Sequence, residues 1–206
     1  MKPHIAISNY FFLLLFLLSQ LQSFSATPSS SSSSSGTYRD TQQLLSFKDS
    51  LPNSTLLPSW LPNQNPCEFS GVSCKLNRVS SINISTIPLS TNLTIVSTFL
   101  MTLDALESLT LKSTGLTGPI SFAAKSKCSP LLTSVDLANN SLSGPISDVS
   151  NLGSCSNLKV LDLSSNLLDF NAKDSARFGL SLQVLDLSFN KISGPAVAVD
   201  PVQRLQ

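Results

Sequence analysis

The most informative shortage in this 206-residue chain is that of charged side chains, and of histidine in particular. Charged residues make up only 12% of the sequence, about half of the ~25% that is usual in soluble domains. The formal net charge is +1, and histidine occurs once, at His4. Because nucleic acids and anionic membranes are bound through basic stripes, this balance argues against both as partners.

His4 lies within a segment that has the pattern of a secretory signal peptide. Lys2 supplies the positive start, residues 10–18 form an apolar run of nine, and the small residues Ser23, Ser25 and Ala26 follow. The alternative, a membrane anchor, needs about 20 apolar residues. We therefore predict a signal peptide over residues 1–26.

Removal of residues 1–26 leaves a mature chain without histidine. Such a chain has no Ser-His-Asp or Cys-His arrangement to activate a nucleophile and no imidazole for a zinc site. Only carboxylates, lysines and tyrosine remain as acid–base groups. We therefore predict no catalytic residue, no metal site and no cofactor, and we expect that this chain is not an enzyme.

A serine-rich stretch over residues 27–38 is expected to be a disordered tether, because it has nothing to bury. A helix is expected to follow, with Asp40 as its N-cap and Gln43 completing a capping box. Pro52 is expected to end it. The apolar face of this helix would consist of Leu44, Phe47 and Leu51, with Leu45 beside them.

Residues 58–74 are rich in proline and asparagine and include two cysteines, Cys67 and Cys74. In a secreted chain these cysteines are expected to form a disulfide, although two free buried thiols remain an alternative. Together with the preceding helix, this loop would form an N-terminal cap over residues 39–78. Its role would be to cover the open apolar end of a stack of repeats.

The repeats are visible as a nine-residue phrase that occurs twice. "LKVLDLSSN" at 158–166 and "LQVLDLSFN" at 182–190 share seven identities. Weaker copies begin at Leu132, Leu106 and Val79, so the steps between starts are 27, 26, 26 and 24 residues. A period in the twenties predicts about five stacked repeats over residues 79–196.

Each copy contains a short alternation of apolar and polar residues that predicts a strand. In the copy that begins at Leu158, Leu161 and Leu163 would point inward, while Val160 and Asp162 would point outward. Successive copies would stack one strand spacing apart, about 4.8 Å, and build a continuous core.

An asparagine recurs where each coil turns inward, and a buried amide there can satisfy backbone groups in adjacent coils. Ile87 takes this position in the first copy and cannot do this, and Thr114 takes it in the second copy and can do less. The predicted structural asparagine ladder consists of Asn140, Asn166 and Asn190. A column of outward carboxylates is interpreted as a solvated surface rather than a metal or acid–base site. It comprises Asp136, Asp162 and Asp186.

Two further cysteines, Cys128 and Cys155, are 27 residues apart and fall on nearly the same point of adjacent coils. Neighbouring strands are close enough for their Cα atoms to fit a disulfide, so we expect these cysteines to pair. Two buried thiols are the alternative.

Four N-x-S/T sequons are candidate glycosylation sites on a secreted chain, and sugars would supply hydration that the sparse charges do not. The sites at Asn53 and Asn92 are favoured because they lie outside the repeat cores. Asn83 and Asn139 lie on or beside predicted strands, and chance matches are common in a serine-rich chain.

The repeat segments resemble the leucine-rich repeats of plants. "LTGPI" (116–120), "LSGPI" (142–146) and "ISGPA" (192–196) are similar to the extension found in the plant-specific class. The segments "QQLLSFK", "GVSCK", "RVSSI", "AAKSKC" and "CSNLK" together resemble the N-terminal ectodomain of brassinosteroid receptor kinases. The likeness extends over residues 38 to about 194, with Phe69 where that family more often has tryptophan.

The resemblance implies an α/β fold, a leucine-rich-repeat solenoid of the plant-specific type with a helical, disulfide-stapled N-terminal cap. It also implies an extracellular recognition or scaffold segment that passes through the secretory pathway to the apoplast or cell surface. A protein partner would bind the concave face of the repeats.

In the resembled family, a long ectodomain binds a steroid, one helix crosses the membrane and a cytoplasmic serine/threonine kinase signals. This sequence shows no second apolar span and no phosphate-binding, catalytic-loop or D-F-G segment. The steroid-contacting insert of that family is absent as well. We therefore expect no membrane span in the mature chain, no kinase activity and no steroid binding by this chain alone.

The alternative is a complete small secreted repeat protein, such as an inhibitor of a cell-wall polygalacturonase. Against it, residues 197–206 contain no closing cysteine pair or polar end cap. The segment is therefore interpreted as a truncated tail. The last coil, with Leu182, Leu185 and Leu187, is expected to lack a neighbour on its C-terminal side.

Overall fold

The computed structural model describes residues 31–120, 127–145, 155–170, 181–192 and 204–205. The chain divides into two units, Met1–Ser32 and Ser33–Gln206, and the repeats belong to the second unit. The predicted signal peptide lies outside the described residues.

Helix α2 spans Ser31–Asp49 and differs from the helix expected to begin at Asp40. The tether predicted over 27–38 is wrong for residues 31–38, because the helix begins nine residues earlier. Tertiary contacts account for the extension: Thr37 Oγ1 donates to the Asn77 carbonyl oxygen over 2.7 Å. In addition, Gly36 lies so close to the Arg78 side chain that a Cβ would collide with it. The expected apolar face is present, since Leu44 and Phe47 are fully buried.

The rest of the cap is built from short helical turns and a hairpin around a buried tryptophan. The 3₁₀ turns η1 (Ser54–Leu56) and η2 (Pro66–Glu68) precede strand β1 (Val72–Lys75). Trp60 is fully buried between two phenylalanines, with ring centroids 6.2 Å from Phe47 and 5.6 Å from Phe69. Its Nε1 donates to the Ser70 carbonyl oxygen. The cap thus has its own aromatic centre, continuous with the core of the repeats.

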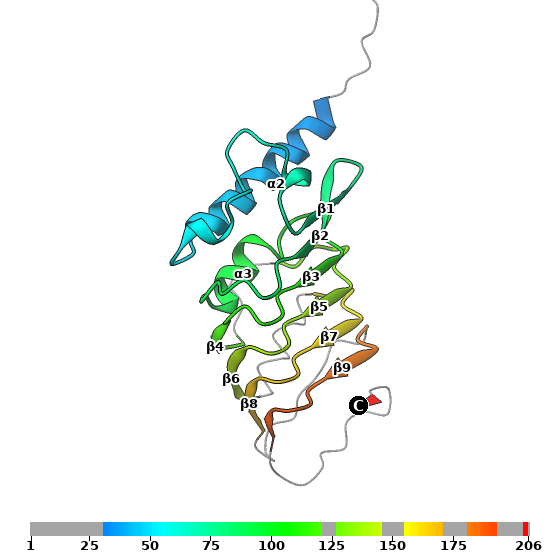
Figure 1. Cartoon of the computed structure of the whole chain (residues 1–206). Helices are drawn as coiled ribbons and strands as arrows, with labels where there is room; N and C mark the ends of the chain where they lie inside the picture. The colour runs from blue at the N-terminus through cyan, green and yellow to red at the C-terminus, as the bar shows by residue number, and fades with distance from the viewer. Residues whose placement is uncertain (1–30, 121–126, 146–154, 171–180, 193–203, 206) are drawn as a thin grey trace, which may run out of the picture. The chain divides into compact units, whose positions relative to one another are not determined.

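The repeats form a seven-stranded sheet in the order β1-β2-β3-β5-β7-β9-β11 (Figure 1). Its strands after β1 are β2 (Arg78–Asn83), β3 (Ser108–Thr110), β5 (Ser134–Asp136), β7 (Val160–Asp162), β9 (Val184–Asp186) and β11 (Arg204–Leu205). Among the described strands, the β1–β2 pair alone is antiparallel. From β2 onward the pairs are parallel, each strand coming from the next coil along the chain.

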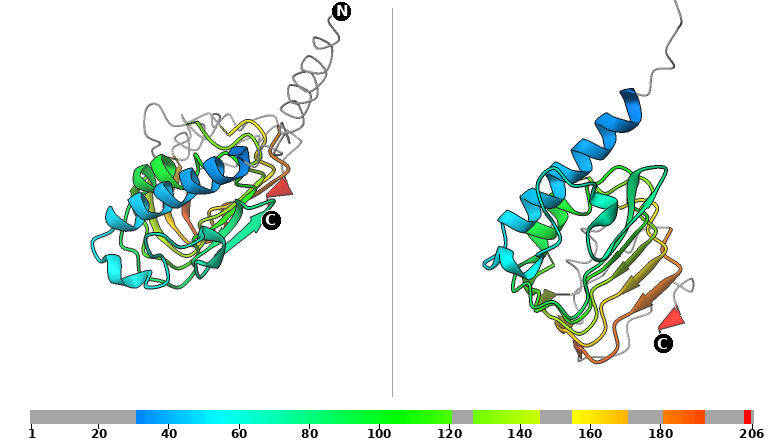
Figure 2. Two further views of the ribbon diagram at one scale, coloured as in Figure 1. Left: turned by 90° about the horizontal axis from the view of Figure 1, so that it is seen from above. Right: turned by 45° about the horizontal axis from the view of Figure 1, so that its top comes forward.

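A second, four-stranded sheet runs through the same coils in the order β10-β8-β6-β4. Its strands are β4 (Thr117–Pro119), β6 (Ser141–Pro145), β8 (Leu167–Phe170) and β10 (Lys191–Ile192). Helix α3 (Leu93–Phe99) belongs to the first coil, and α2 lies across the end of the stack (Figure 2). The two sheets and the helices enclose one apolar core.

Strand positions follow the predicted alternation. Leu161 and Leu163 are 1% and 0% exposed, whereas Val160 is 37% exposed. The leucine-rich-repeat fold inferred from the sequence is therefore confirmed. Its core is a column of aligned aliphatic side chains, which buries apolar surface that a single coil could not cover alone.

The last coil is covered where the sequence led us to expect a missing neighbour. Strand β11 pairs in parallel with β9, with Leu205 opposite Leu185. Leu182, Leu185 and Leu187 are 6%, 1% and 7% exposed. The expectation of an open coil is therefore wrong, because two residues of the predicted tail pair with the edge of β9.

Candidate recognition face

Outward side chains of β2, β3, β5, β7 and β9 form two parallel columns that we call the strand face. Strand register aligns one residue from each strand in each column. The first column consists of Ser81, Ser108, Ser134, Val160 and Val184. The second consists of Asn83, Thr110, Asp136, Asp162 and Asp186. None of these ten side chains belongs to the buried core.

The three aspartates of the second column shape the turns that leave their strands. Each carboxylate oxygen Oδ1 accepts a hydrogen bond from the backbone N–H two residues later, at 2.8–2.9 Å. Such local turns are the usual role of aspartate at strand ends. All three aspartates are half-buried rather than buried. Among the described residues, no group of three or more acidic, histidine or cysteine side chains is arranged to hold a metal ion.

The asparagine ladder joins each coil to the one before it. Asn166 Nδ2 donates to the carbonyl oxygens of Leu137 and Leu163 at 3.1 and 3.0 Å, and also to Ser164. Its Oδ1 accepts from the Leu142 N–H at 3.0 Å. One amide therefore satisfies four backbone groups, two of them in the preceding coil.

The neighbouring asparagines repeat this geometry. Asn140 Oδ1 accepts from the N–H groups of Thr114 and Leu116, both one coil earlier. Asn190 Oδ1 accepts from Leu168, and its Nδ2 donates to Leu163. The contacts thus reach back toward the N-terminus. The sequence indicated which asparagines form the ladder. It did not indicate whether each one contacts the preceding or the following coil, because the spacing of 24–26 residues is the same in both directions.

Replacing Asn166 with alanine is expected to lower the free energy of unfolding by about 1–3 kcal/mol, because buried backbone groups lose their partners. Asn190→Ala should cost less, although its bonds are equivalent, because Asn190 is half-buried and water can reach the groups it serves. Urea denaturation followed by circular dichroism measures both. Asn157→Ala, which removes an exposed contact to the Pro130 carbonyl, is the control. Equally negligible shifts for Asn166 and Asn190 would contradict the role assigned to the ladder.

All four cysteines are joined in two bonds. Cys67–Cys74 links η2 to β1 within the cap, with the Cα atoms 5.5 Å apart. Cys128–Cys155 links adjacent coils, with the Cα atoms 4.9 Å apart. One bond therefore fastens the cap, and the other ties two adjacent coils at points that precede their strands β5 and β7.

The four sequon asparagines are exposed but differ in how their amides are used. Asn53, Asn83 and Asn92 each accept a backbone hydrogen bond through Oδ1, from Thr55, Ser85 and Ile95 respectively. In contrast, Asn139 donates from Nδ2 to Ser113 Oγ over 2.7 Å. Since a glycan is attached at Nδ2, these contacts use the other amide atom in three of the four sequons and the attachment atom itself in the fourth.

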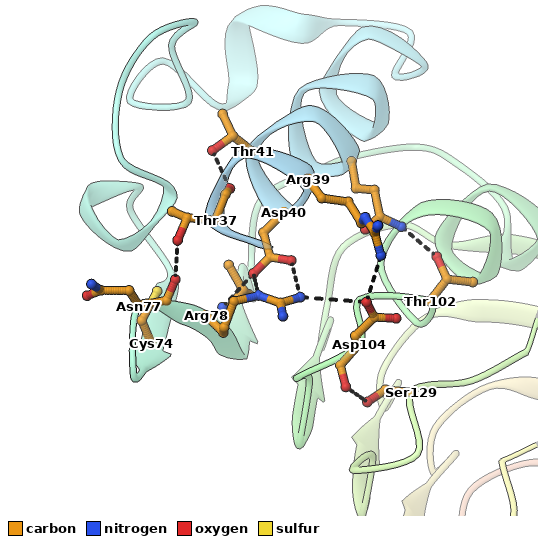
Figure 3. A network of polar contacts seen from close by, with 12 residues as sticks. Thr37, Arg39, Asp40, Thr41, Cys74, Asn77, Arg78, Thr102, Asp104 and Ser129 are labelled. Carbon is orange, nitrogen blue, oxygen red and sulfur yellow. Dashed lines mark hydrogen bonds and ion pairs between the residues drawn. The ribbon is translucent and has the colours of Figure 1, made fainter. Parts of the chain in front are cut away.

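An ionic network that the sequence did not reveal connects the cap to the first coils (Figure 3). Asp40 is fully buried, and its carboxylate accepts from Arg78 Nε and NH2, each at 2.9 Å, and from the Val79 N–H. Arg78 also lies 3.8 Å from Asp104, which pairs with Arg39. The hydrogen bond to Asp40 raises the pKa of Arg78 above its ordinary value, despite opposing desolvation. The guanidinium is therefore held charged at every accessible pH.

Asp40 was expected to be a helix N-cap and is instead an interior helical residue. Its capping-box partner is likewise used elsewhere, because Gln43 Nε2 donates to Thr102 Oγ1. The expectation is wrong because the partner of Asp40 is 38 residues away in sequence. No local pattern could have indicated that pairing.

None of the helices in the described part of the chain has the length and apolar character needed to cross a membrane.

Three family models match the chain. The leucine rich repeat N-terminal domain matches residues 38–75, and leucine rich repeat models match residues 131–152 and 180–198. These matches cover the cap and two of the coils.

Curated relatives are plant receptor kinases. The chain is 49% identical over 192 residues to a brassinosteroid LRR receptor kinase of Solanum lycopersicum, covering 92% of this chain and 16% of the relative. It is 47% identical over 194 residues to BRASSINOSTEROID INSENSITIVE 1 of Arabidopsis thaliana, covering 94% and 15%. The chain thus spans about one sixth of these relatives. Neither relative is a small secreted inhibitor.

Solved structures with the same fold include two Arabidopsis ectodomains. The receptor kinase HAESA ectodomain, solved with the peptide hormone ligand IDA, is 29% identical with a TM-score of 0.61. The match covers 77% of this chain and 26% of that one. The BIR2 ectodomain is 29% identical with a TM-score of 0.56, over 75% of this chain and 82% of that one.

Proposed function

The chain belongs to the leucine-rich-repeat proteins, as a homologue of plant brassinosteroid receptor kinase ectodomains, and we propose that it is an extracellular recognition segment. The observation that carries the proposal is the strand face, where five consecutive strands present aligned outward side chains. Solenoid proteins use extended surfaces of this kind for binding. The strand face, expected to be concave, is therefore the proposed contact surface for a protein partner.

The partner class is supported by the HAESA ectodomain, which was solved with a peptide hormone. The likeness of fold supports a protein or peptide ligand for this chain as well. The two disulfides suit the oxidising secretory pathway and the extracellular space. We propose that the chain functions there, outside the cell or at its surface.

We propose no catalytic activity, no cofactor and no steroid binding for this chain. The sequence contains one histidine, within the predicted signal peptide. The most regular group of carboxylates, on the strand face, directs one oxygen of each member to a backbone turn. Kinase activity and steroid recognition belong to relatives of which this chain spans about one sixth.

Site-specific photo-crosslinking tests the proposed recognition face. A photoreactive residue in place of Ser134, in the middle of the strand face, is expected to capture an extracellular plant protein. The same residue in place of Thr117, which is exposed on the opposite sheet in β4, is the matched control. Capture from Ser134 alone supports recognition through the strand face. Equal capture from both positions, or capture from Thr117 alone, overturns it.

We also propose that Asn53, Asn83 and Asn92 carry glycans and that Asn139 does not. In the first three, Nδ2 has no partner among the described residues, whereas Nδ2 of Asn139 is engaged by Ser113. Enzymatic deglycosylation in heavy-oxygen water, followed by mass mapping of the secreted chain, is expected to label the first three asparagines. Labelling of Asn139 without labelling of Asn53 would contradict this proposal.

A further inference from the structure

The strand face changes its chemistry between β5 and β7. In the first column, the serines of the early strands give way to Val160 and Val184, which are 37% and 48% exposed. The two valines are register partners, so they lie one strand spacing apart, about 4.8 Å. Two adjacent β-branched side chains are therefore presented to solvent in positions where the neighbouring coils have hydroxyl groups.

The second column changes from neutral to anionic one strand earlier, between β3 and β5. Asn83 and Thr110 are followed by three aspartates in consecutive strands, each two residues along its strand from a first-column residue. Two residues of strand separate the columns by about 6.6 Å. The ion pairs between described residues connect Arg39, Lys75 and Arg78 with Asp40, Asp104 and Glu107. None of them neutralises an aspartate of the strand face.

The change also extends to the loop after β9. Ser113, Asn139 and Ser165 occupy equivalent left-handed positions in three coils, with φ of 55–58°. Phe189 takes that position in the next coil, with φ of 57° and 84% of its surface exposed. A bulky side chain is unusual in this conformation. The coil of β9 therefore presents apolar groups at both its strand and its turn, whereas the coil of β7 has one at its strand and the coils of β3 and β5 have neither.

We propose that the strand face over β5, β7 and β9 binds an extended peptide segment in which apolar and basic residues alternate. This inference rests on the proposed recognition function and names the ligand chemistry. In an extended chain, successive side chains point to opposite sides. A segment that runs across the strands, parallel to the two columns and between them, directs its apolar side chains to Val160 and Val184. Its basic side chains then face the carboxylates.

Charge complementarity decides the occupant. An apolar segment without basic residues would leave the three carboxylates without a positively charged partner, and an acidic segment would be repelled. Strands β2 and β3 carry neither the valines nor the aspartates, and Asn83 on β2 belongs to a sequon whose proposed glycan would cover both strands. Strands β2 and β3 therefore lie outside the proposed peptide site, which is the strand face over β5, β7 and β9.

Fluorescence anisotropy with the full secreted chain and three labelled nonapeptides tests the inference. The first peptide alternates arginine and valine, the second contains the same residues in two blocks, and the third has glutamate for arginine. The alternating peptide is expected to bind at least about tenfold more tightly than the block peptide. The glutamate peptide is expected not to bind.

Substitutions on the strand face locate the binding. Val160→Ser with Val184→Ser restores the residue type of the earlier coils and is expected to weaken binding about tenfold or more. Asp162→Asn keeps the acceptor for the Ser164 N–H but removes the charge, and should weaken binding and reduce its salt dependence. Thr117→Ala, on the opposite sheet, should leave binding unchanged. Unfolding midpoints close to that of the parent chain show that the fold is intact.

Equal binding of the alternating and block peptides, or full binding by the double serine variant, overturns the inference. The absence of binding by all three peptides also overturns it. If crosslinking from Ser134 still captures a protein, only the peptide chemistry is wrong and the recognition function stands. If crosslinking from Ser134 fails, the proposed function is wrong whatever the peptides do.

Discussion

Replacing Asp40 with alanine is expected to lower the free energy of unfolding by about 3–5 kcal/mol, because it strands a partly buried guanidinium. The Asp40 side chain is 1% exposed and that of Arg78 is 25% exposed, so water cannot fully replace the lost carboxylate. The Val79 N–H loses its acceptor as well. Urea denaturation followed by circular dichroism measures the change.

Asp104→Ala is the matched control for Asp40→Ala. Asp104 belongs to the same network, but its side chain is 56% exposed and its contacts are longer, at 3.2 and 3.8 Å. Exposed pairs of this kind contribute about 0–1 kcal/mol. Similar losses for both variants would show that the burial of Asp40 is not the source of its effect.

Trp60→Ala is expected to cost about 3–5 kcal/mol, the range for removing a large aromatic side chain from a core. Trp60 is fully buried and stacks on Phe69, and its loss would leave a cavity between Phe69 and Phe47. The Ser70 carbonyl would also lose its donor. Chemical denaturation monitored by far-ultraviolet circular dichroism is suitable, because the substitution removes the fluorophore.

The neighbouring residue provides the comparison for Trp60. Leu61 is 43% exposed, and Leu61→Ala is expected to change stability by no more than about 0.5 kcal/mol. Trp60→Phe retains most of the apolar volume and should fall between the two. A cost below that of Leu61→Ala would contradict the assignment of Trp60 as the centre of the cap.

The spacing of the leucines predicted the repeats, because it shows which side chains must be buried in a common core. Leu161 and Leu163 had to face a common core, and the structure buries both. The asparagine at a fixed position of each repeat likewise indicated which side-chain amides would form hydrogen bonds with backbone groups. These inferences could be drawn from the sequence because each depends on residues in the same coil or on a strict period.

The cap was harder to predict because its structure depends on distant partners. Asp40 has a good local pattern for an N-cap, but Arg78 engages it 38 residues later and the helix extends back to Ser31. The pairing of β11 with β9 similarly requires a two-residue strand that no alternation reveals. On the strand face, the exposed valines become informative only when register places them beside each other.

The backward direction of the asparagine ladder has a consequence for biosynthesis. Asn166 satisfies the Leu142 N–H and the Leu137 carbonyl, groups that belong to chain synthesised earlier. A coil that emerges from the ribosome is therefore expected to lack these protein partners until the asparagine of the next coil has been synthesised. The cap and its first coil are the exception, since Asp40 and Arg78 are joined within the first synthesised segment. Assembly is thus expected to proceed in order from the cap, each coil being completed by its successor.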